Sequence, residues 1–489
     1  MTTSPRRIRL LVVAAAALAF AGGTRLTAQP RDAAYYAFRS SVDTGRPRPG
    51  VPVFRLSRDY PARLPGPCAE CTWYQVGVDF STNFPVPTTG HGWSDGNWDQ
   101  YLQRIFEYVK QGQDPALSDS AGFRVRVNGK TRWFNVPWMA YDPTAGREYV
   151  HGTTNERTAH LSELVRGPVP PRAGMLRAIT VPGTQLHRGT SFLAGTTPEC
   201  QREFPHGFET WSVGYYNEYG GYALGRAFAT TGHPRTAPVL GSEIPDGLPF
   251  PQGTVVVKVL TTNAPIRCVP YLKGSPEWQV NRHTLDSTNA YTCNRAVQVD
   301  HIVQVDVAVV DTLSPTRWVY GTYGYDGNRP GTTFWDHLVP LGVQWGADPW
   351  TFPAVPSAES QPLQQTVINP DNKLPEHLGC RGRLAGPVDN PQSSCVSCHA
   401  SAFAPRRGAP ALMGVNVPPS FGFGGLCTQY SLDNASYFQT FRAPQGFPGG
   451  KFPDAMSLDT SLQLAVALGQ YGQYHTSSAP VACTNPNQF

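Results

Sequence analysis

The sequence predicts a mainly β protein of the α+β class, built on an antiparallel sheet with a few short helices and long loops rich in Pro and Gly. Gly (48) and Pro (47) are frequent among the 489 residues, and such a chain turns often, which favours short strands over long helices. Residues 296–310 alternate between apolar and polar side chains, which is typical of a long antiparallel strand. Within residues 123–142, Asn128 and Gly129 join two strand-like segments and indicate a hairpin turn.

The strand predicted at residues 296–310 has two chemically different faces. One face carries Val297, Val299, His301, Val303, Val305, Val307 and Val309. The opposite face carries Gln298, Asp300, Gln304 and Asp306. A single His on an apolar face is more often a hydrogen-bonded core residue than a ligand. Residues 250–260 and 317–325 predict two further strands, the first of them preceded by a turn.

Two amphipathic helices are predicted. The first places Trp98, Leu102, Ile105 and Val109 on one face, with Asn97 as its N-cap and Gly112 as its end. The second, near the end of the chain, places Leu458, Leu462, Ala465 and Leu468 on one face, with Gly469 near its end. We expect such apolar stripes to pack against the core.

The first 28 residues have the pattern of a secretory signal. Arg6, Arg7 and Arg9 precede a run of roughly twelve apolar residues, and small residues follow at candidate cleavage sites. The alternative is an uncleaved anchor, but the run is shorter than the roughly 20 residues of a membrane span. This segment carries four Arg and no acid, so the charge of +5 falls to about +1 without it. We expect a periplasmic or secreted mature chain with no membrane span and no nucleic-acid partner.

A Cys-x-x-Cys-His motif lies at Cys395, Cys398 and His399 and is typical of covalent c-type haem attachment. Two thiols at this spacing can each add to one vinyl group of a porphyrin, and the adjacent imidazole can bind the iron as its proximal ligand. Covalent attachment suits an exported protein, because the haem cannot dissociate. The sequence therefore predicts one covalently bound haem c, with Cys395 and Cys398 as its attachment points and His399 as a metal ligand.

Two other interpretations of this motif remain open: a disulfide hairpin beside an unrelated His, and half of a zinc site. A zinc site needs a second pair of ligands, which Cys68 and Cys71 would supply. Thr72 follows that pair, so it is not a second haem motif. Eight of the ten Cys lie outside the motif, and their even number suggests disulfides. From proximity in the sequence, the expected pairs are Cys268 with Cys293 and Cys427 with Cys483.

The sixth ligand of the iron decides what the haem can do. A Met ligand would complete the coordination, raise the reduction potential and make an electron carrier. Met456 is the first candidate and Met413 the second, and the alternative for both is a role as core filler. An open sixth position would instead let a small molecule bind, with Asp306, His301 or Lys258 as acid, base or pocket wall.

The order of several segments resembles that of the cytochrome P-460 family of exported, β-rich, monohaem c-type proteins. The segments are residues 205–207, 211–217, 250–258, 305–306 and 317–320, followed by the haem motif. The resemblance implies that Lys258 lies beside the haem and can be cross-linked to the porphyrin. It also implies that Asp306 occupies roughly the place of the distal-pocket acid of catalytic members. The family's acidic residue after the lysine is Val259 here, and residues 29–200 and 406–489 have no counterpart.

The chain is divided by these observations into a signal peptide at 1–28, an N-terminal β-rich region at 29–200, a haem domain at 201–405 and a C-terminal loop and helix at 406–489. The N-terminal region is either a separate domain or an extension of the same sheet. The first expected function is electron transfer to a redox partner protein. The alternatives are a haem oxidoreductase acting on a small nitrogen compound or peroxide, and a haem-based ligand sensor.

Overall fold

We analysed a computed structural model that describes residues 59–80, 93–117, 123–135, 149–159, 198–228, 235–348, 363–405 and 455–468, with short gaps inside several of these ranges. The signal segment, Met413, Cys427 and Cys483 lie outside the described residues. The helices are η1 (Thr72–Gln75), α4 (Trp98–Lys110), α7 (Pro198–Glu203), α8 (Glu218–Ala227), α9 (Ala237–Glu243), η2 (Pro270–Leu272), η3 (Phe334–His337) and α10 (Cys395–His399). The strands are β1 (Arg126–Val127), β2 (Lys130–Thr131), β3 (Tyr149–Val150), β4 (Thr153–Ala159), β5 (Phe208–Tyr216), β6 (Val255–Thr262), β7 (Glu277–Leu285), β8 (Tyr291–Val310), β9 (Trp318–Tyr325), β10 (Leu338–Gln344), β11 (Thr366–Ile368), β12 (Phe403–Pro405) and β13 (Ala455–Ser457).

The predicted fold class is confirmed, because one nine-stranded antiparallel sheet organises the described residues. Its strand order is β11-β10-β9-β8-β6-β5-β4-β3, and β7 pairs with the outer half of the long strand β8. Two-stranded pairs are formed by β1 with β2 and by β12 with β13. β3 and β4 come from the region before residue 200, and they extend the same sheet. None of the described helices has the length and apolar character that crossing a membrane requires.

Helix α4 covers one face of this sheet, which we call the valine face. It is formed by Val255, Val257, Val259, Val305, Val307 and Val309, each at most 3% exposed. The predicted apolar stripe of α4 is buried against it in a single core cluster. The helix begins after Asn97 as predicted, but Asn97 is left-handed (φ 61°) and does not cap the backbone. Its amide instead donates to the carbonyl of Gly77 at 3.1 Å.

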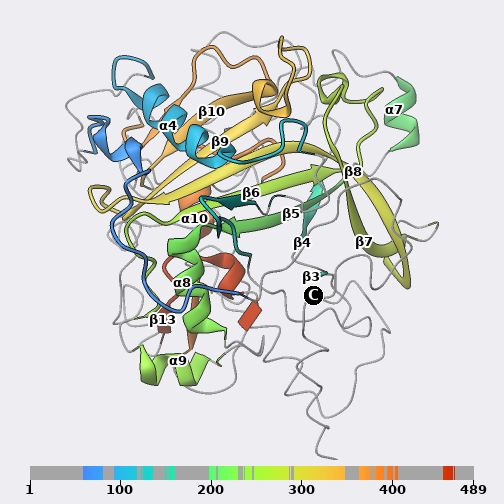
Figure 1. The fold of residues 1–489 in the computed structure, drawn as a ribbon. Coiled ribbons are helices and arrows are strands. Elements are labelled where there is room, and N and C mark those ends of the chain that lie inside the picture. The colour runs from blue at the N-terminus through green and yellow to red at the C-terminus, as the bar shows by residue number, and fades with distance from the viewer. Residues whose placement is uncertain are drawn as a thin grey trace, which may run out of the picture.

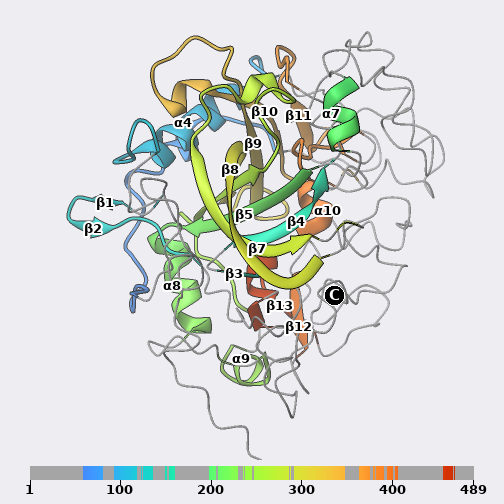
Figure 2. The same ribbon diagram turned by 90° about the vertical axis from the view of Figure 1, so that its right-hand side faces the viewer.

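The opposite face, which we call the polar face, is covered by α8, the haem motif and the C-terminal elements (Figure 1). Along the central strands it carries Lys258, Gln304, Asp306, Tyr320 and Gln344, which share one side of the pleat by register. Figure 2 shows that α10 and the pair β12–β13 lie on this side of the sheet, away from α4. The sheet therefore separates the core around α4 from the titratable residues Lys258 and Asp306 and from the Cys-x-x-Cys-His motif.

The predicted placement of His301 on the valine face is wrong. Residues Leu260 and Gln304 are partners across β6 and β8, but the next pair along β6 joins Thr261 to Ile302. The extra residue is a β-bulge, and it reverses which face each side chain takes on either side of it. His301 consequently pairs with Thr262, on the same side of the pleat as Gln304.

The cysteine pairing also differs from the prediction. Cys200 is bonded to Cys268, so the expected pair of Cys268 with Cys293 is wrong. The disulfide bridges 68 residues and ties α7 to the loop after β6. Cys68 is bonded to Cys71. Sheet topology brings Cys200 and Cys268 together, and no spacing rule in the sequence could have shown this.

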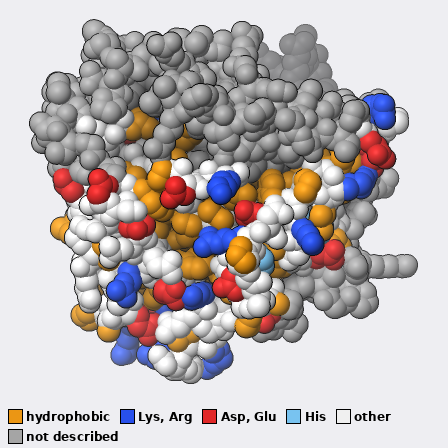
Figure 3. Space-filling model, turned by 90° about the horizontal axis from the view of Figure 1, so that it is seen from above, with side chains coloured by type: hydrophobic (Ala, Val, Ile, Leu, Met, Phe, Trp, Pro, Cys, Tyr) orange, Lys and Arg blue, Asp and Glu red, His pale blue; other side chains and the backbone are white. Residues whose placement is uncertain are grey.

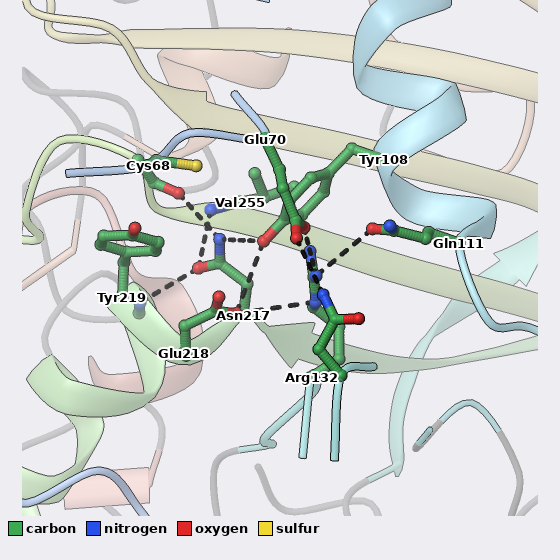
Figure 4. Close-up of polar contacts among 12 residues, drawn as sticks. Cys68, Glu70, Tyr108, Gln111, Arg132, Asn217, Glu218, Tyr219 and Val255 are labelled. Carbon is green, nitrogen blue, oxygen red and sulfur yellow. Dashed lines mark hydrogen bonds and ion pairs between the residues drawn. The ribbon is translucent and has the colours of Figure 1, made fainter. Parts of the chain in front are cut away.

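A cluster of polar contacts anchors the N-terminal segments to the sheet (Figure 4). Arg132, only 4% exposed, forms ion pairs with Glu70 and with Glu218, the latter at 3.8 Å, and stacks over the ring of Tyr108 at 4.4 Å. The amide of Asn217 donates to the Tyr108 hydroxyl at 2.9 Å. These contacts join the β1–β2 hairpin, predicted at Asn128 and Gly129, to α4 and α8.

Candidate functional site

The Cys-x-x-Cys-His motif forms the short helix α10 on the polar face. The backbone N–H of Cys395 donates to the carbonyl of Leu384 at 3.0 Å, and that of Val396 donates to Oε1 of Gln344 at 3.0 Å. The first turn is thus held by a loop and by strand β10. Residues three apart on a helix lie on one side of it, so Cys395 and Cys398 lie on the same side of α10.

His399 is oriented by the C-terminal segment. Its Nδ1 lies 2.9 Å from the carbonyl oxygen of Thr460, which can only accept a hydrogen bond, so Nδ1 carries the proton. In the neutral imidazole the lone pair is then on Nε2, which is the nitrogen that can bind a metal. The ring of Tyr320 lies 5.1 Å from the imidazole, centroid to centroid.

Met456 lies in β13, directly opposite Ala404 of β12, and is fully buried. It belongs to the apolar cluster that also contains Val396 of α10. Met456, the first predicted candidate for the sixth ligand, therefore packs in the same apolar cluster as a residue of the Cys-x-x-Cys-His motif. Its role as a ligand stays a prediction, and this packing is also what a core filler would show.

The two residues that the family resemblance singled out, Lys258 and Asp306, are direct partners across β6 and β8. Lys258 Nζ lies 3.8 Å from Oδ1 of Asp389, a residue in the loop before α10. Nε2 of Gln304 donates to Asp306 at 2.7 Å and to Asp389 at 2.9 Å, so one amide bridges the two carboxylates. The backbone N–H of Gly386 also donates to Asp389, at 2.9 Å.

Asp306 has a strongly perturbed pKa. Burial is the main cause and repulsion from Asp389 the second; Lys258, Gln304 and Thr322 oppose them, and the pKa is raised to about 8. Solvent reaches part of this side chain, but protein surrounds it closely enough for desolvation to dominate. Asp306 therefore holds its proton to a higher pH than an ordinary exposed Asp does.

The same charges act on the Cys-x-x-Cys-His motif. Burial, followed by repulsion from Asp306 and Asp389, holds the pKa of the Cys395 thiol well above its usual range, while Lys258 opposes these effects. Lys258 and Asp306 therefore act electrostatically on Cys395, although both lie far from it in the sequence.

The middle of the polar face is less completely covered than the valine face. Val256, Lys258, Asp306 and Ala308 are partly exposed although β6 and β8 are central strands, and so are Cys395, Cys398 and His399. The valines on the opposite face of the same strands are fully buried. Solvent therefore reaches the place where the predicted attachment residues meet apolar and titratable side chains.

These observations fit a covalently attached porphyrin better than the two other interpretations of the motif. Cys395 and Cys398 are both thiols and are not bonded to each other, which disagrees with a disulfide hairpin. Cys68 and Cys71 are disulfide-bonded, so they cannot complete a zinc site with the motif. The described residues contain no cluster of three or more His, Cys, Asp or Glu side chains arranged to hold a metal ion.

Sequence reasoning missed four residues of this site: Gln304, Asp389, Tyr320 and Thr460. Gln304 had a usable signal, because it lies two residues before Asp306 on the predicted strand and therefore on the same face. Asp389 precedes the motif by six residues, but no spacing rule assigns it a role. Thr460 is 61 residues from His399, and only the fold brings its carbonyl to the imidazole.

The surface seen from the α4 side does not indicate a charged partner (Figure 3). Lys and Arg side chains are interspersed with Asp and Glu among apolar ones over the described part of this face. An arrangement of mixed sign provides little long-range steering.

Comparison with known proteins returned no relative: no family model matches the chain, and no curated protein or solved structure matches it.

Proposed function

We propose that this chain is an exported c-type cytochrome that carries one covalently attached haem and transfers electrons to a redox partner protein. The observation that best supports this proposal is the geometry of α10. This helix carries two thiols on one side of a single turn and ends with an imidazole whose tautomer leaves Nε2 as the metal-binding nitrogen. This proposal uses the attachment motif together with the contacts that orient it.

Each residue of the motif has a defined task in this proposal. Cys395 and Cys398 would hold the porphyrin by thioether bonds, and His399 would bind the iron through Nε2. The bound haem would supply reversible one-electron chemistry. The partly exposed apolar side chains of Val256 and Ala308 would contact the porphyrin, and the Thr460 carbonyl would keep the imidazole from turning.

The test is expression of the full chain, with its leader, in a host that has working cytochrome c maturation. We expect coloured protein with the added mass of one haem. Cys395→Ala combined with Cys398→Ala should remove both the colour and the added mass. The matched control is Cys68→Ala with Cys71→Ala, which removes another Cys-x-x-Cys pair and should retain the haem. Colourless wild-type protein without the added mass would contradict the proposal.

A second candidate function is a haem oxidoreductase acting on a small nitrogen compound or peroxide, as the resemblance to the cytochrome P-460 family implies. The observation that favours it is the pairing of Asp306 with Lys258 across β6 and β8, on a face that solvent reaches, together with the burial and the neighbouring Asp389 that raise the pKa of Asp306. A carboxylic acid with a pKa near neutrality is suited to general acid–base catalysis.

The absorption spectrum of the reduced protein separates the two functions. Sharp α and β bands indicate six-coordinate, low-spin iron and favour the electron carrier. A broad, red-shifted band indicates a modified or open haem and favours the oxidoreductase. In the second case Lys258→Arg tests the cross-link, because it keeps the positive charge near Asp389 but removes the amine that would bond to the porphyrin.

A further inference from the structure

The turn that holds His399 has an unusual backbone. Asp459 (φ 49°) and Thr460 (φ 67°) are consecutive residues in the left-handed region, and neither is glycine. A β-branched residue rarely adopts this conformation. Such a backbone persists only where surrounding contacts stabilise it, and it is frequent at functional sites. The conformation points the Thr460 carbonyl at Nδ1 of His399.

The carboxylate of Asp459 holds this turn from three directions. Its Oδ2 accepts hydrogen bonds from the backbone N–H of Phe250 at 2.7 Å and from Nη1 of Arg317 at 3.1 Å. Its Oδ1 accepts one from Nε1 of Trp318, also at 3.1 Å. The Asp459 side chain is only 8% exposed, so these contacts are shielded from water.

Strand β9 holds the turn at a second point. The Tyr320 hydroxyl donates to Oγ1 of Thr460 at 2.8 Å. Trp318 and Tyr320 are two residues apart on one strand and therefore lie on the same face, so β9 binds both residues of the turn. The position of the Thr460 carbonyl thus depends on the sheet as well as on its own backbone.

We propose that Asp459 is a positioning residue for His399: by fixing the Asp459–Thr460 turn, it sets the strength of the Nδ1 hydrogen bond and, through it, the reduction potential of the haem. This inference rests on the proposed function. A strong hydrogen bond from Nδ1 makes the imidazole a better donor to the iron, which stabilises the oxidised state. Weakening that bond should raise the potential.

Two variants separate this effect from a simple effect of charge. Asp459→Asn removes a negative charge, and Arg317→Gln removes the positive charge that pairs with it. Charge alone would raise the potential in the first variant and lower it in the second. Positioning predicts an increase in both, because each variant loosens the same turn. The matched control is Asp311→Asn, another turn carboxylate, which accepts from Tyr101 on the α4 side of the sheet.

The experiment measures the haem potential and the hydrogen-exchange rate of the His399 ring N–H. The exchange is followed by NMR in the reduced, low-spin protein, with carbon monoxide added where the iron has an open position. We expect exchange at least tenfold faster in both variants and a tenfold shift of the oxidised-to-reduced ratio in Asp459→Asn, or about 59 mV upward. The control should change neither quantity.

Unchanged exchange in Asp459→Asn, or opposite shifts of potential in the two variants, would overturn the inference. If Asp459→Asn does not accumulate, Arg317→Gln decides the question alone, because its site is more exposed and either result is informative. Absence of haem from the wild-type protein would contradict the proposed function instead, so the two failures are distinguishable.

Discussion

Replacing Asp306 with Asn should change how the stability of the protein depends on pH. The ordinary pKa of an Asp is 3.8, and the fold raises that of Asp306 to about 8. Between these two pH values the folded chain therefore keeps a proton that the unfolded chain has released. The stability that this proton contributes is complete below pH 3.8 and is lost as the pH rises through about 8. Asn has a similar shape and cannot ionise, so the variant lacks this loss.

The size of the effect follows from the two pKa values. At 1.36 kcal/mol per pKa unit, a carboxyl with a pKa of about 8 in the fold and 3.8 when unfolded lowers the free energy of unfolding by up to about 4 kcal/mol between about pH 5 and about pH 8. Asp306 shares its surroundings with Asp389 and partly contacts solvent. We therefore expect the difference in the free energy of unfolding between variant and wild type to change by about 2 kcal/mol over this pH interval.

The assay is urea unfolding of the full chain at a series of pH values, followed by circular dichroism. The control is Asp336→Asn, because Asp336 is exposed in a capping box and its pKa is lowered rather than raised. That variant should lose the same stability at about pH 5 and about pH 8. An Asp306→Asn protein whose stability falls with pH as steeply as the wild type would refute the reasoning.

Three further changes test the packing of the site and its surroundings. Gly386→Ala would place a Cβ in collision with the side-chain amide of Gln304; we expect a loss of about 1–3 kcal/mol in urea unfolding as the bridging amide is displaced. Cys200→Ala with Cys268→Ala opens a disulfide of sequence separation 68 and should cost about 4 kcal/mol, and an unchanged urea midpoint would contradict this pairing. Met456→Leu should keep the absorption spectrum and cost less than about 1.5 kcal/mol if the residue is core filler, whereas a changed spectrum would identify it as a ligand.

Local patterns in the chain predicted much of the sheet and its covering helix. The alternation along residues 296–310 corresponds to β8, and the stripe beginning at Trp98 corresponds to α4. The turn at Asn128 and Gly129 is present, with both residues at positive φ. These features depend on residues close together in the sequence, so periodicity and turn chemistry were sufficient.

The predictions that were wrong concern features that depend on contacts between distant parts of the chain. The bulge in β8 moved His301 to the other face, because a register slip depends on the partner strand and leaves no mark in the alternation itself. Cys268 pairs with Cys200 rather than Cys293 because sheet topology decides which thiols meet. Proximity along the chain is a poor guide to disulfide pairing where the fold brings together residues as far apart as Cys200 and Cys268.

By itself, the sequence determined the chemistry that the chain can offer: a pair of thiols one helical turn apart, an adjacent imidazole, and an acid and a lysine on predicted strands. Only the tertiary structure decided how those groups behave. It placed Lys258 opposite Asp306, brought Asp389 to the same point, and supplied the Thr460 carbonyl that selects the tautomer of His399. The physical reason is that identity and spacing are local properties, whereas burial, charge coupling and hydrogen-bond partners arise from contacts between distant segments.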